Sequence, residues 1–344
     1  NKARKQIASI INADPAEILI TSGGTESNNT AVNGITSQFP NSHIITTSIE
    51  HDAILEPCKK LSSNAFKVDY LPVDKFGMIN PLDLENIISE KTSLVSVMFG
   101  NNEVGTIQPI QKIAKICHKN QIIFHTDAVQ VVGKITVDVK ELDVDLLSIS
   151  SHKLHGPKGI GALYIKDGVK INPMILGGGQ EFRLRSGTEN VANIVGFGQA
   201  CEIAQNHLTE NSSCIKKLQS KLVKKVLAEI PEVTFNGHEE YRLYNNAHFT
   251  FLGVNGEDLI IKLDEYGIAA STGSACSVNT QKASHVLEAM GFSLEQITGS
   301  LRLTVGIFNT ENEMNETVEI LKKVIEELRA VSPFKEKYSF ESKN

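Results

Sequence analysis

The sequence predicts an α/β protein whose large domain contains a mostly parallel sheet covered by helices, followed by a smaller α+β domain. Short apolar runs rich in Ile and Val recur through the first two hundred or so residues and are typical of buried strands. Helical patterns separate several of these runs, and such alternation favours a parallel sheet with helices on both faces. From about residue 207 the pattern changes to long lysine-rich helices and sparser strands. We therefore expect two domains, 1–207 and 208–344.

Each element of the large domain is predicted by its own pattern. Apolar residues in the segment 108–120 share one helical face, which predicts a helix packed on the sheet. The expected strands are EILIT (17–21), HIITTS (43–48), SLVSVMF (93–99), IIFHT (122–126), DLLSIS (145–150) and IGALYI (160–165). The apolar residues of the helix are Ile110, Ile113, Ala114 and Cys117.

The smaller domain begins with a helical pattern over 214–230, whose lysines are expected to form a solvated face. Strand patterns follow at 245–252 and 300–305. The last helix opens with a capping box of Thr310 and Glu313. Its apolar residues then recur at helical spacing: Met314, Val318, Leu321, Ile325 and Leu328.

Composition and charge exclude several classes of function. Hydrophobic residues make up 41% and charged residues 22%, values of an ordinary globular protein, and no apolar stretch is long enough to cross a membrane. The net charge of -6 opposes direct binding to nucleic acid. Five cysteines without a CxxC pair indicate neither a disulfide framework nor a metal site. They indicate a reducing compartment, the cytoplasm or an organellar matrix.

The segment SISSHKLHGPKGIGALYI (148–165) carries the strongest chemical signal. A buried strand ends there at Ser150, His152 and Lys153, and ligands gather at such strand ends in open α/β sheets. A lysine among hydroxyl and imidazole donors suits a Schiff base with pyridoxal phosphate (PLP), whose phosphate the neighbours would hold. A plain surface charge is the alternative for a lysine in this position.

Two further motifs support a PLP site. HTDAVQ (125–130) ends a strand at Asp127, where a carboxylate would keep the pyridine nitrogen protonated, although an Asp there also fits a helix cap. TSGGTESNN (21–29) opens a helix, so the backbone N–H groups of Gly24 and Thr25 and the Thr25 hydroxyl form an anion site. The motif is neither GxGxxG nor GxxxxGK[ST], which disfavours dinucleotide and P-loop binding.

Three polar side chains at other strand ends fit the same cofactor. His51 in SIEHDAIL is placed to stack on the pyridine ring and to handle protons near neutral pH, although a lone histidine is more often structural. Asn102 in FGNNEVGTIQPI and Gln130 in HTDAVQ are placed to hydrogen-bond the ring oxygen.

In combination, seven segments resemble the fold-type I PLP enzymes, and more narrowly the class V aminotransferase branch that includes the cysteine desulfurases. The resemblance runs in order from about residue 5 to 338. The segments are TSGGTESNN, EHDAIL, NNEVGTIQPI, HTDAVQ, SHKLHGPKGIGALY, GGGQEFRLRSGTEN and SLRLTVG. The resemblance to these enzymes implies a homodimer with shared active sites.

The resemblance also implies a role for each candidate residue. Lys153 would hold PLP, with His51 on the ring and Asp127 at the pyridine nitrogen. Asn102 and Arg302 would bind the substrate. Arg302 would bind its carboxylate, because a guanidinium binds a carboxylate with two parallel hydrogen bonds. The ring oxygen is assigned to Asn102 and Gln130. The phosphate is assigned to Gly24, Thr25, Ser150 and His152, with Thr188 from a second subunit.

Cys276 decides the reaction in this resemblance. It lies in ASTGSACSVNTQKASHVLEAMG (270–291), a small, polar, glycine-containing stretch that predicts an exposed loop. STGSAC resembles the active-site loop of group I cysteine desulfurases, the nitrogen-fixation and iron-sulfur-cluster type. The other cysteines are expected to be buried small hydrophobes: Cys58, Cys117, Cys201 and Cys214.

The implied reaction removes sulfur from L-cysteine, releases L-alanine and leaves a persulfide on Cys276. Protein acceptors such as an iron-sulfur scaffold or a sulfur-relay protein would take that sulfur. The alternatives are a selenocysteine lyase, another class V enzyme such as an aminotransferase, or a truncated non-catalytic scaffold. Cys276 argues against an aminotransferase, and the intact set of Lys153, Asp127, Arg302 and Cys276 argues against a scaffold.

The sequence departs from the family in two places. The chain opens on Asn1, without the DNAAT-like segment that usually begins the family, so we expect upstream residues to be missing. Gln281 to Ser284 stand where the family commonly has a Glu-Pro-Ser stretch, so the partner contacts of this loop are expected to differ.

Overall fold

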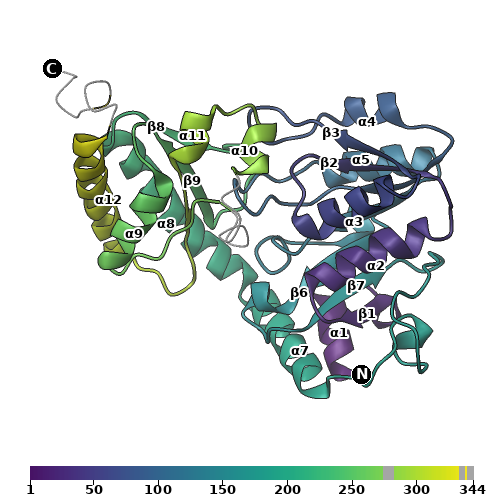
Figure 1. Ribbon diagram of the computed structural model, residues 1–344. Coiled ribbons are helices and arrows are strands. Elements are labelled where there is room, and N and C mark those ends of the chain that lie inside the picture. Colours follow the sequence, from purple (N-terminus) through teal and green to yellow (C-terminus); the bar gives the residue numbers. More distant parts are fainter. Residues whose placement is uncertain (274–282, 333–337, 339–344) are drawn as a thin grey trace. The chain divides into compact units, whose positions relative to one another are not determined.

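The chain forms two units, each with its own β-sheet (Figure 1). The computed structural model describes residues 1–273, 283–332 and 338. The first unit comprises residues 1–73, 79–101 and 108–209, and the second comprises the described residues of 74–78, 102–107 and 210–344. The segments 74–78 and 102–107, which the sequence placed in the large domain, are thus part of the second unit.

The sheet of the first unit has seven strands in the order β1-β7-β6-β5-β4-β2-β3. The five strands from β3 to β6 in this order run parallel, whereas β7 is antiparallel to both of its neighbours. The mostly parallel sheet predicted from the sequence is confirmed. The strands are β1 (Ile18–Thr21), β2 (His43–Thr47), β3 (Lys67–Leu71), β4 (Thr92–Ser96), β5 (Ile123–Asp127), β6 (Leu146–Ser150) and β7 (Gly161–Ile165).

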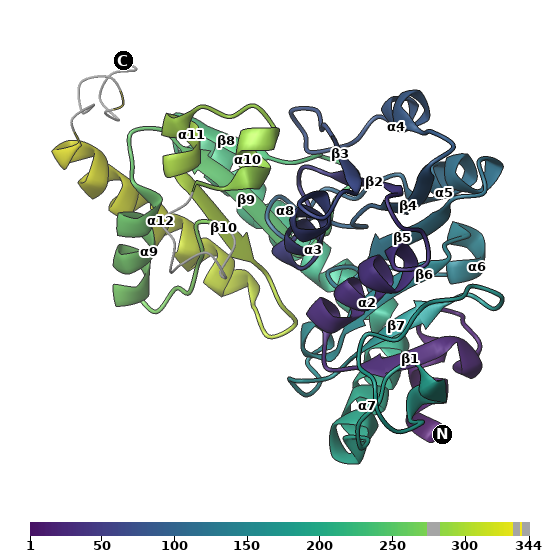
Figure 2. The same ribbon diagram turned by 45° about the vertical axis from the view of Figure 1, so that its right-hand side comes forward.

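Helices flank this sheet. Figure 2 shows α2 and α3 on one side of the strands and α5 and α6 on the other. The apolar residues predicted on one face of α5 are all buried. The helices are α1 (Lys2–Ser9), α2 (Gly24–Thr36), α3 (Asp52–Ser62), α4 (Pro81–Ile87), α5 (Ile110–Lys119), α6 (Val139–Leu142) and α7 (Val191–Asn206), with 3-10 helices η1 (Pro15–Glu17), η2 (Ser151–Leu154) and η3 (Glu181–Arg183).

One strand of this sheet, β3, was not predicted. It lies at the edge and pairs only with β2, and just its last residue, Leu71, is buried. An edge strand with polar and exposed positions lacks the apolar run that revealed the other strands.

The second unit has a three-stranded antiparallel sheet in the order β10-β9-β8. The capping box of α12 is confirmed, because Thr310 Oγ1 accepts a hydrogen bond from the Glu313 N–H and Glu313 Oε2 accepts one from the Thr310 N–H. Among described residues, no helix is both long and apolar enough to span a bilayer. The elements are α8 (Leu208–Glu229), β8 (Val233–Asn236), β9 (Asn246–Phe251), α9 (Gly256–Glu265), α10 (His285–Ala289), α11 (Leu294–Thr298), β10 (Ser300–Thr304) and α12 (Glu311–Val331).

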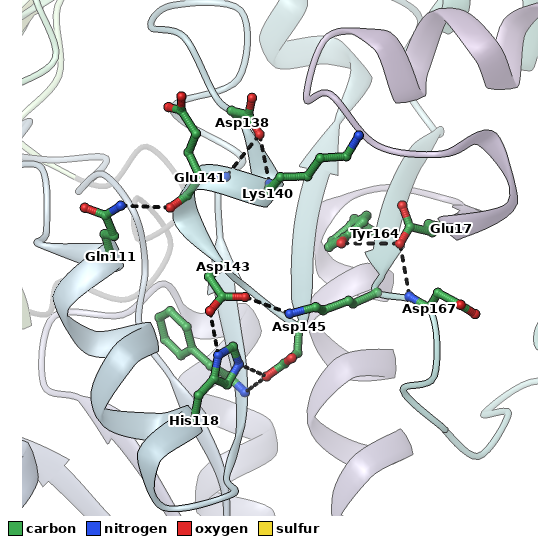
Figure 3. Close-up of polar contacts among 12 residues, drawn as sticks. Glu17, Gln111, His118, Asp138, Lys140, Glu141, Asp143, Asp145, Tyr164 and Asp167 are labelled. Carbon is green, nitrogen blue, oxygen red and sulfur yellow. Dashed lines mark hydrogen bonds and ion pairs between the residues drawn. The ribbon is translucent and has the colours of Figure 1, made fainter.

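A cluster of charges lies near the amino ends of β5 and β6, away from their carboxyl ends (Figure 3). Both ring nitrogens of His118 bind carboxylates, Nδ1 at 2.9 Å from Asp143 and Nε2 at 3.0 Å from Asp145. Asp145 also accepts from the Phe124 N–H at 2.8 Å, and Lys166 donates to Asp143 at 2.7 Å. Partial burial lowers the pKa of His118, but the two carboxylates outweigh it and raise that pKa above its usual value.

His118 therefore predicts a pH dependence of stability. A raised folded-state pKa means that the stabilisation is fully present below about pH 6.5 and is lost as the pH rises through the folded pKa. We expect His118→Gln to lower the free energy of unfolding by about 1 kcal/mol near pH 6 and by less near pH 9. Urea unfolding at both pH values measures this. His207→Gln, at an exposed position after α7, is the control; an equal loss for His118→Gln at both pH values would contradict the charge-based role.

Candidate active site

The parallel strands bring the predicted residues of the first unit to one edge of its sheet. Asp127 is the last residue of β5, and Ser150 is the last residue of β6. Lys153 follows β6 within η2, and His51 follows β2 as the N-cap of α3. These positions arise because the carboxyl ends of neighbouring parallel strands meet at the same edge of a sheet.

Asp127 is a buried carboxylate, 7% exposed. Asn28 Nδ2 donates to its Oδ2 at 2.6 Å, and the Val129 N–H donates to its Oδ1 at 2.9 Å. Burial raises the pKa of Asp127 above its usual value, although the two hydrogen bonds and the positive charges of His51 and Lys153 act to lower it. A buried carboxylate is costly without a cation. This one is therefore suited to a ligand with a protonated ring nitrogen.

His51 caps α3, and this contact sets the tautomer of its neutral ring. Its Nδ1 accepts from the Ala53 N–H at 3.0 Å, so a neutral ring carries its proton on Nε2. The preceding residue, Glu50, is completely buried and accepts from the Met98 N–H at 2.7 Å. Burial, with the negative charge of Asp127, raises the pKa of Glu50 to about 8, so this carboxyl is mainly protonated near neutral pH.

The start of α2 lies beside Ser150. A Cβ built on Gly24 would lie 3.6 Å from the Ser150 Cβ and 2.7 Å from a Val129 methyl, so a larger residue would clash. Within the described chain no side chain caps α2, and its first N–H groups have no partner within the helix. Thr25 is exposed at this end, and His152 Nδ1 lies 2.9 Å from the Ser150 Oγ. These groups form a place for an anion.

Gln130 is held by a lysine one turn further along the chain. Lys134 Nζ donates to the Gln130 backbone oxygen at 2.5 Å and lies 3.4 Å from its Oε1. Burial, with the positive charge of Lys153, lowers the pKa of Lys134 to about 7. Because Lys134 donates to Oε1, the NH₂ group of the Gln130 amide points away from Lys134. That NH₂ group can then donate to a ligand oxygen.

Thr188 lies in an exposed segment that follows a strained turn. All three residues of η3 have positive φ although none is glycine, a conformation that costs roughly 1–2 kcal/mol per residue. The Glu181 carboxylate offsets part of this cost, because it accepts from Arg4 Nη2 at 2.6 Å and from the Ile20 N–H at 2.8 Å. The turn that precedes Thr188 is therefore fixed to the start of the chain.

The second unit contains the other predicted residues. Arg302 lies on β10, and its Nη1 donates to the backbone oxygen of Asn102 at 2.7 Å. Asn102 was placed at the ring oxygen from the sequence, and it belongs to this unit with Arg302. Cys276 lies outside the described residues, in the segment 274–282.

One prediction about the remaining cysteines is wrong. Cys58, Cys117 and Cys201 are buried as expected, but Cys214 is exposed. The buried face of α8 begins one residue later, at Ile215, and Cys214 lies outside that face. Among the described residues, no group of His, Cys, Asp and Glu side chains is arranged to hold a metal ion.

Three residues near the predicted site were not identified from the sequence: Asn28, Glu50 and Lys134. Asn28 lies one turn after Gly24 on the buried side of α2, where an amide needs a polar partner. Glu50 lies three residues after the end of β2 and is completely buried, where a carboxyl must be hydrogen-bonded. The buried positions of Asn28 and Glu50 were the signals that could have identified these two residues from the sequence.

Known proteins resemble this chain along nearly its whole length. The family model described as aminotransferase class-V matches residues 1–316. The cysteine desulfurase IscS of Methanosarcina thermophila is 49% identical over 335 residues, which are 97% of this chain and 83% of that protein. A solved NifS-like protein superposes with a TM-score of 0.88 at 41% identity, over 96% of this chain and 87% of its own. The structure of SspA in complex with cysteine has a TM-score of 0.78 at 35% identity. The match covers 90% of this chain and 87% of the SspA chain.

The hydrogen bond from Asn28 to Asp127 predicts an effect on cofactor affinity. Without it, Asp127 is less well oriented and less often ionised, so it binds a protonated ring nitrogen more weakly. We expect Asn28→Ala to weaken PLP binding about tenfold, the size of one hydrogen bond to a charged group. Titration of the cofactor-free protein with PLP measures this.

The neighbouring Asn29→Ala is the matched control, because the Asn29 amide donates to the backbone oxygens of Thr25 and Ala53. Its affinity should stay within about twofold of the wild type. Equal PLP affinity in Asn28→Ala and the wild type would show that Asp127 does not need this contact.

Proposed function

Because this chain belongs to the aminotransferase class-V family, as a group I cysteine desulfurase, we propose that Lys153 holds PLP and that Cys276 accepts the sulfur of L-cysteine. The observation that supports this most directly is the buried Asp127 carboxylate, whose pKa is influenced by the charges of His51 and Lys153. A carboxylate, an imidazole and an amine in one place are the groups that a PLP site requires.

The described residues fit the cofactor. Asp127 would pair with the ring nitrogen, and His51 would lie on the ring. Gln130, with its amide oriented by Lys134, would donate to the ring oxygen together with Asn102. The phosphate would be held at the start of α2 (Gly24, Thr25), by Ser150 and His152, and by Thr188 of a second subunit. When bound, PLP supplies an electron sink for the electron pair that the substrate carbon retains after losing its proton.

The residues of the chain position the substrate and carry its proton. Arg302 would bind the substrate carboxylate through its planar fork, and its hydrogen bond to the Asn102 carbonyl fixes the direction of that side chain. Lys153 Nζ would take the α proton from the substrate. This assignment gives the lysine two roles, covalent attachment and proton transfer.

Cys276 carries the sulfur step. Its thiolate attacks the substrate sulfur, a sulfur–sulfur bond forms and the substrate carbon–sulfur bond breaks. The bonding electrons stay with carbon, which gains a proton, so the products are L-alanine and a persulfide on Cys276. Burial raises the pKa of the Cys58 and Cys201 thiols to about 12, and it raises that of Cys117 as well. These three thiols are therefore poor competitors.

We further propose a homodimer. Support comes from exposed apolar side chains in and beside the segment 177–190 that contains Thr188, which a monomer would leave in water. The exposed residues are Met174, Ile175, Leu176, Phe182, Val191 and Val195.

Protein acceptors, such as an iron-sulfur scaffold or a sulfur-relay protein, would take the persulfide sulfur from Cys276. The Cys276 thiol must be free in order to accept sulfur, and a reducing compartment keeps thiols free. We therefore place the activity in the cytoplasm or in an organellar matrix.

Two variants separate cofactor chemistry from sulfur acceptance. Lys153→Ala should lose the visible absorbance of lysine-bound PLP and all turnover. Cys276→Ser should keep that absorbance but form neither persulfide nor alanine at a useful rate, because a hydroxyl is a far weaker nucleophile than a thiolate toward sulfur. Absorbance spectra and alanine assays measure both effects.

Mass spectrometry after brief exposure to cysteine should locate the added sulfur on the wild-type peptide that contains Cys276. Cys214→Ala is the control, since Cys214 is the exposed cysteine of the described chain and should not be needed. Sulfur on Cys58, Cys117, Cys201 or Cys214 would mean that Cys276 is the wrong assignment.

The dimer is tested by one surface substitution. Leu176 is 80% exposed, and Leu176→Asp should convert the dimer into a monomer because it would bury a charge at the proposed contact. Leu294→Asp, at a leucine 72% exposed in the second unit, should leave the dimer intact. Sedimentation velocity distinguishes the two species. A wild type that is monomeric while it binds PLP tightly would rule the dimer out.

A further inference from the structure

We propose that Glu103 is a positioning residue that fixes the two ends of the segment 274–282, which contains Cys276, and that sulfur transfer therefore depends on Glu103. This inference rests on the proposed role of Cys276. Glu103 follows Asn102 and is almost completely buried, with 1% exposure. Burial of a carboxylate lowers the free energy of unfolding unless hydrogen bonds compensate. The contacts of the Glu103 carboxylate therefore indicate a role beyond packing.

The backbone around Glu103 is held on both sides by side chains of the second unit. Asn246 Nδ2 donates to the Glu103 backbone oxygen at 2.7 Å. Arg242 Nη2 donates to the Val104 oxygen at 3.1 Å, and Arg302 Nη1 donates to the Asn102 oxygen. Three consecutive carbonyl groups are thus bound by three different side chains, so the backbone at Glu103 is held in place.

The Glu103 carboxylate binds the residue that leads out of the segment. Ser284 Oγ donates to Glu103 Oε2 at 2.5 Å, a distance typical of a hydroxyl on a carboxylate. The same Ser284 oxygen accepts from the Leu287 N–H at 3.2 Å and so caps α10. Glu103 therefore fixes the point at which the chain enters α10.

The residue that leads into the segment lies against the same carboxylate. A Cβ on Gly273 would lie 3.1 Å from Glu103 Oε2 and 3.9 Å from the Ser284 Cβ. Gly273 has φ +150°, and its backbone oxygen accepts from the Ser271 hydroxyl at 3.2 Å. Both ends of the segment thus meet at one carboxylate oxygen.

The entering end is also joined to the strand of Arg302. The Arg302 N–H donates to the Ser271 oxygen at 2.6 Å, and Ser300 Oγ donates to the Thr272 oxygen at 2.9 Å. The proposed substrate-binding arginine and both ends of the segment that contains Cys276 therefore share one network with Glu103. The geometry assigns this network the task of placing the Cys276 segment relative to the arginine.

The test uses Glu103→Ala and Glu103→Gln in the full chain. In Glu103→Ala, sulfur transfer to Cys276 should slow about tenfold or more, because a small misplacement of a reacting group is costly. The visible PLP absorbance and the KM for cysteine should stay within about twofold of the wild type. Glu103→Gln, whose amide oxygen still accepts from Ser284, should stay within about threefold of the wild type in rate.

A second readout does not depend on activity. Hydrogen–deuterium exchange in the cofactor-free protein should increase in Glu103→Ala for peptides that cover 268–273 and 283–290. Exchange in Glu103→Gln should match the wild type. Ser293→Ala removes the corresponding cap of α11; it should leave sulfur transfer unchanged, which shows that loss of a cap in this unit is not sufficient.

Three outcomes would overturn the proposal: wild-type sulfur transfer in Glu103→Ala, loss of PLP binding together with activity in that variant, or equal damage in Glu103→Ala and Glu103→Gln. Failure of the proposed function is recognised separately. In that case the wild type itself would form no persulfide on Cys276, whatever the residue at position 103.

Discussion

The buried carboxylate of Asp127 is the constraint on which the candidate site depends. Removing a carboxylate from water is unfavourable unless hydrogen bonds and a positive charge compensate. Asn28 and the Val129 N–H supply the hydrogen bonds, and Lys153 and His51 supply the neighbouring positive charge. Each of these groups is positioned by a strand end or by the helix that follows one. The fold of the first unit thus places every group that surrounds the Asp127 carboxyl.

Much of this unit was predictable because its signals are local. Each central strand is an apolar run, and the polar residue that ends it lies at the ligand-binding edge whatever the details of packing. The edge strand β3 has no such run and was missed. Asn28 was missed for a different reason: its sequence motif was recognised for its glycines, whereas its hydrogen bond joins residues 99 positions apart. Cys214 was expected to be buried but is exposed. The buried face of α8 begins at the next residue, Ile215, and the sequence pattern does not locate such a face to the single residue.

The membership of 102–107 in the second unit was not predictable from the sequence. No composition change marks this segment, and its assignment results from backbone carbonyls that bind Arg242, Asn246 and Arg302. Backbone acceptors are the same in every residue, so the sequence does not distinguish those that will be bound from a distance. Asn102 was accordingly described as the end of a large-domain strand, whereas the side chain that binds its carbonyl, Arg302, lies in the second unit.

The same carbonyls have a consequence for synthesis on the ribosome. The side chains that bind the carbonyls of Asn102, Glu103 and Val104 are translated 200, 143 and 138 residues later. At about 5–20 residues per second, this interval lasts roughly 10–40 s. During that time these three carbonyl groups cannot make the contacts that hold them in the finished fold. The second unit is therefore completed only after β10 has left the exit tunnel, when the sheet of the first unit has long been available to fold.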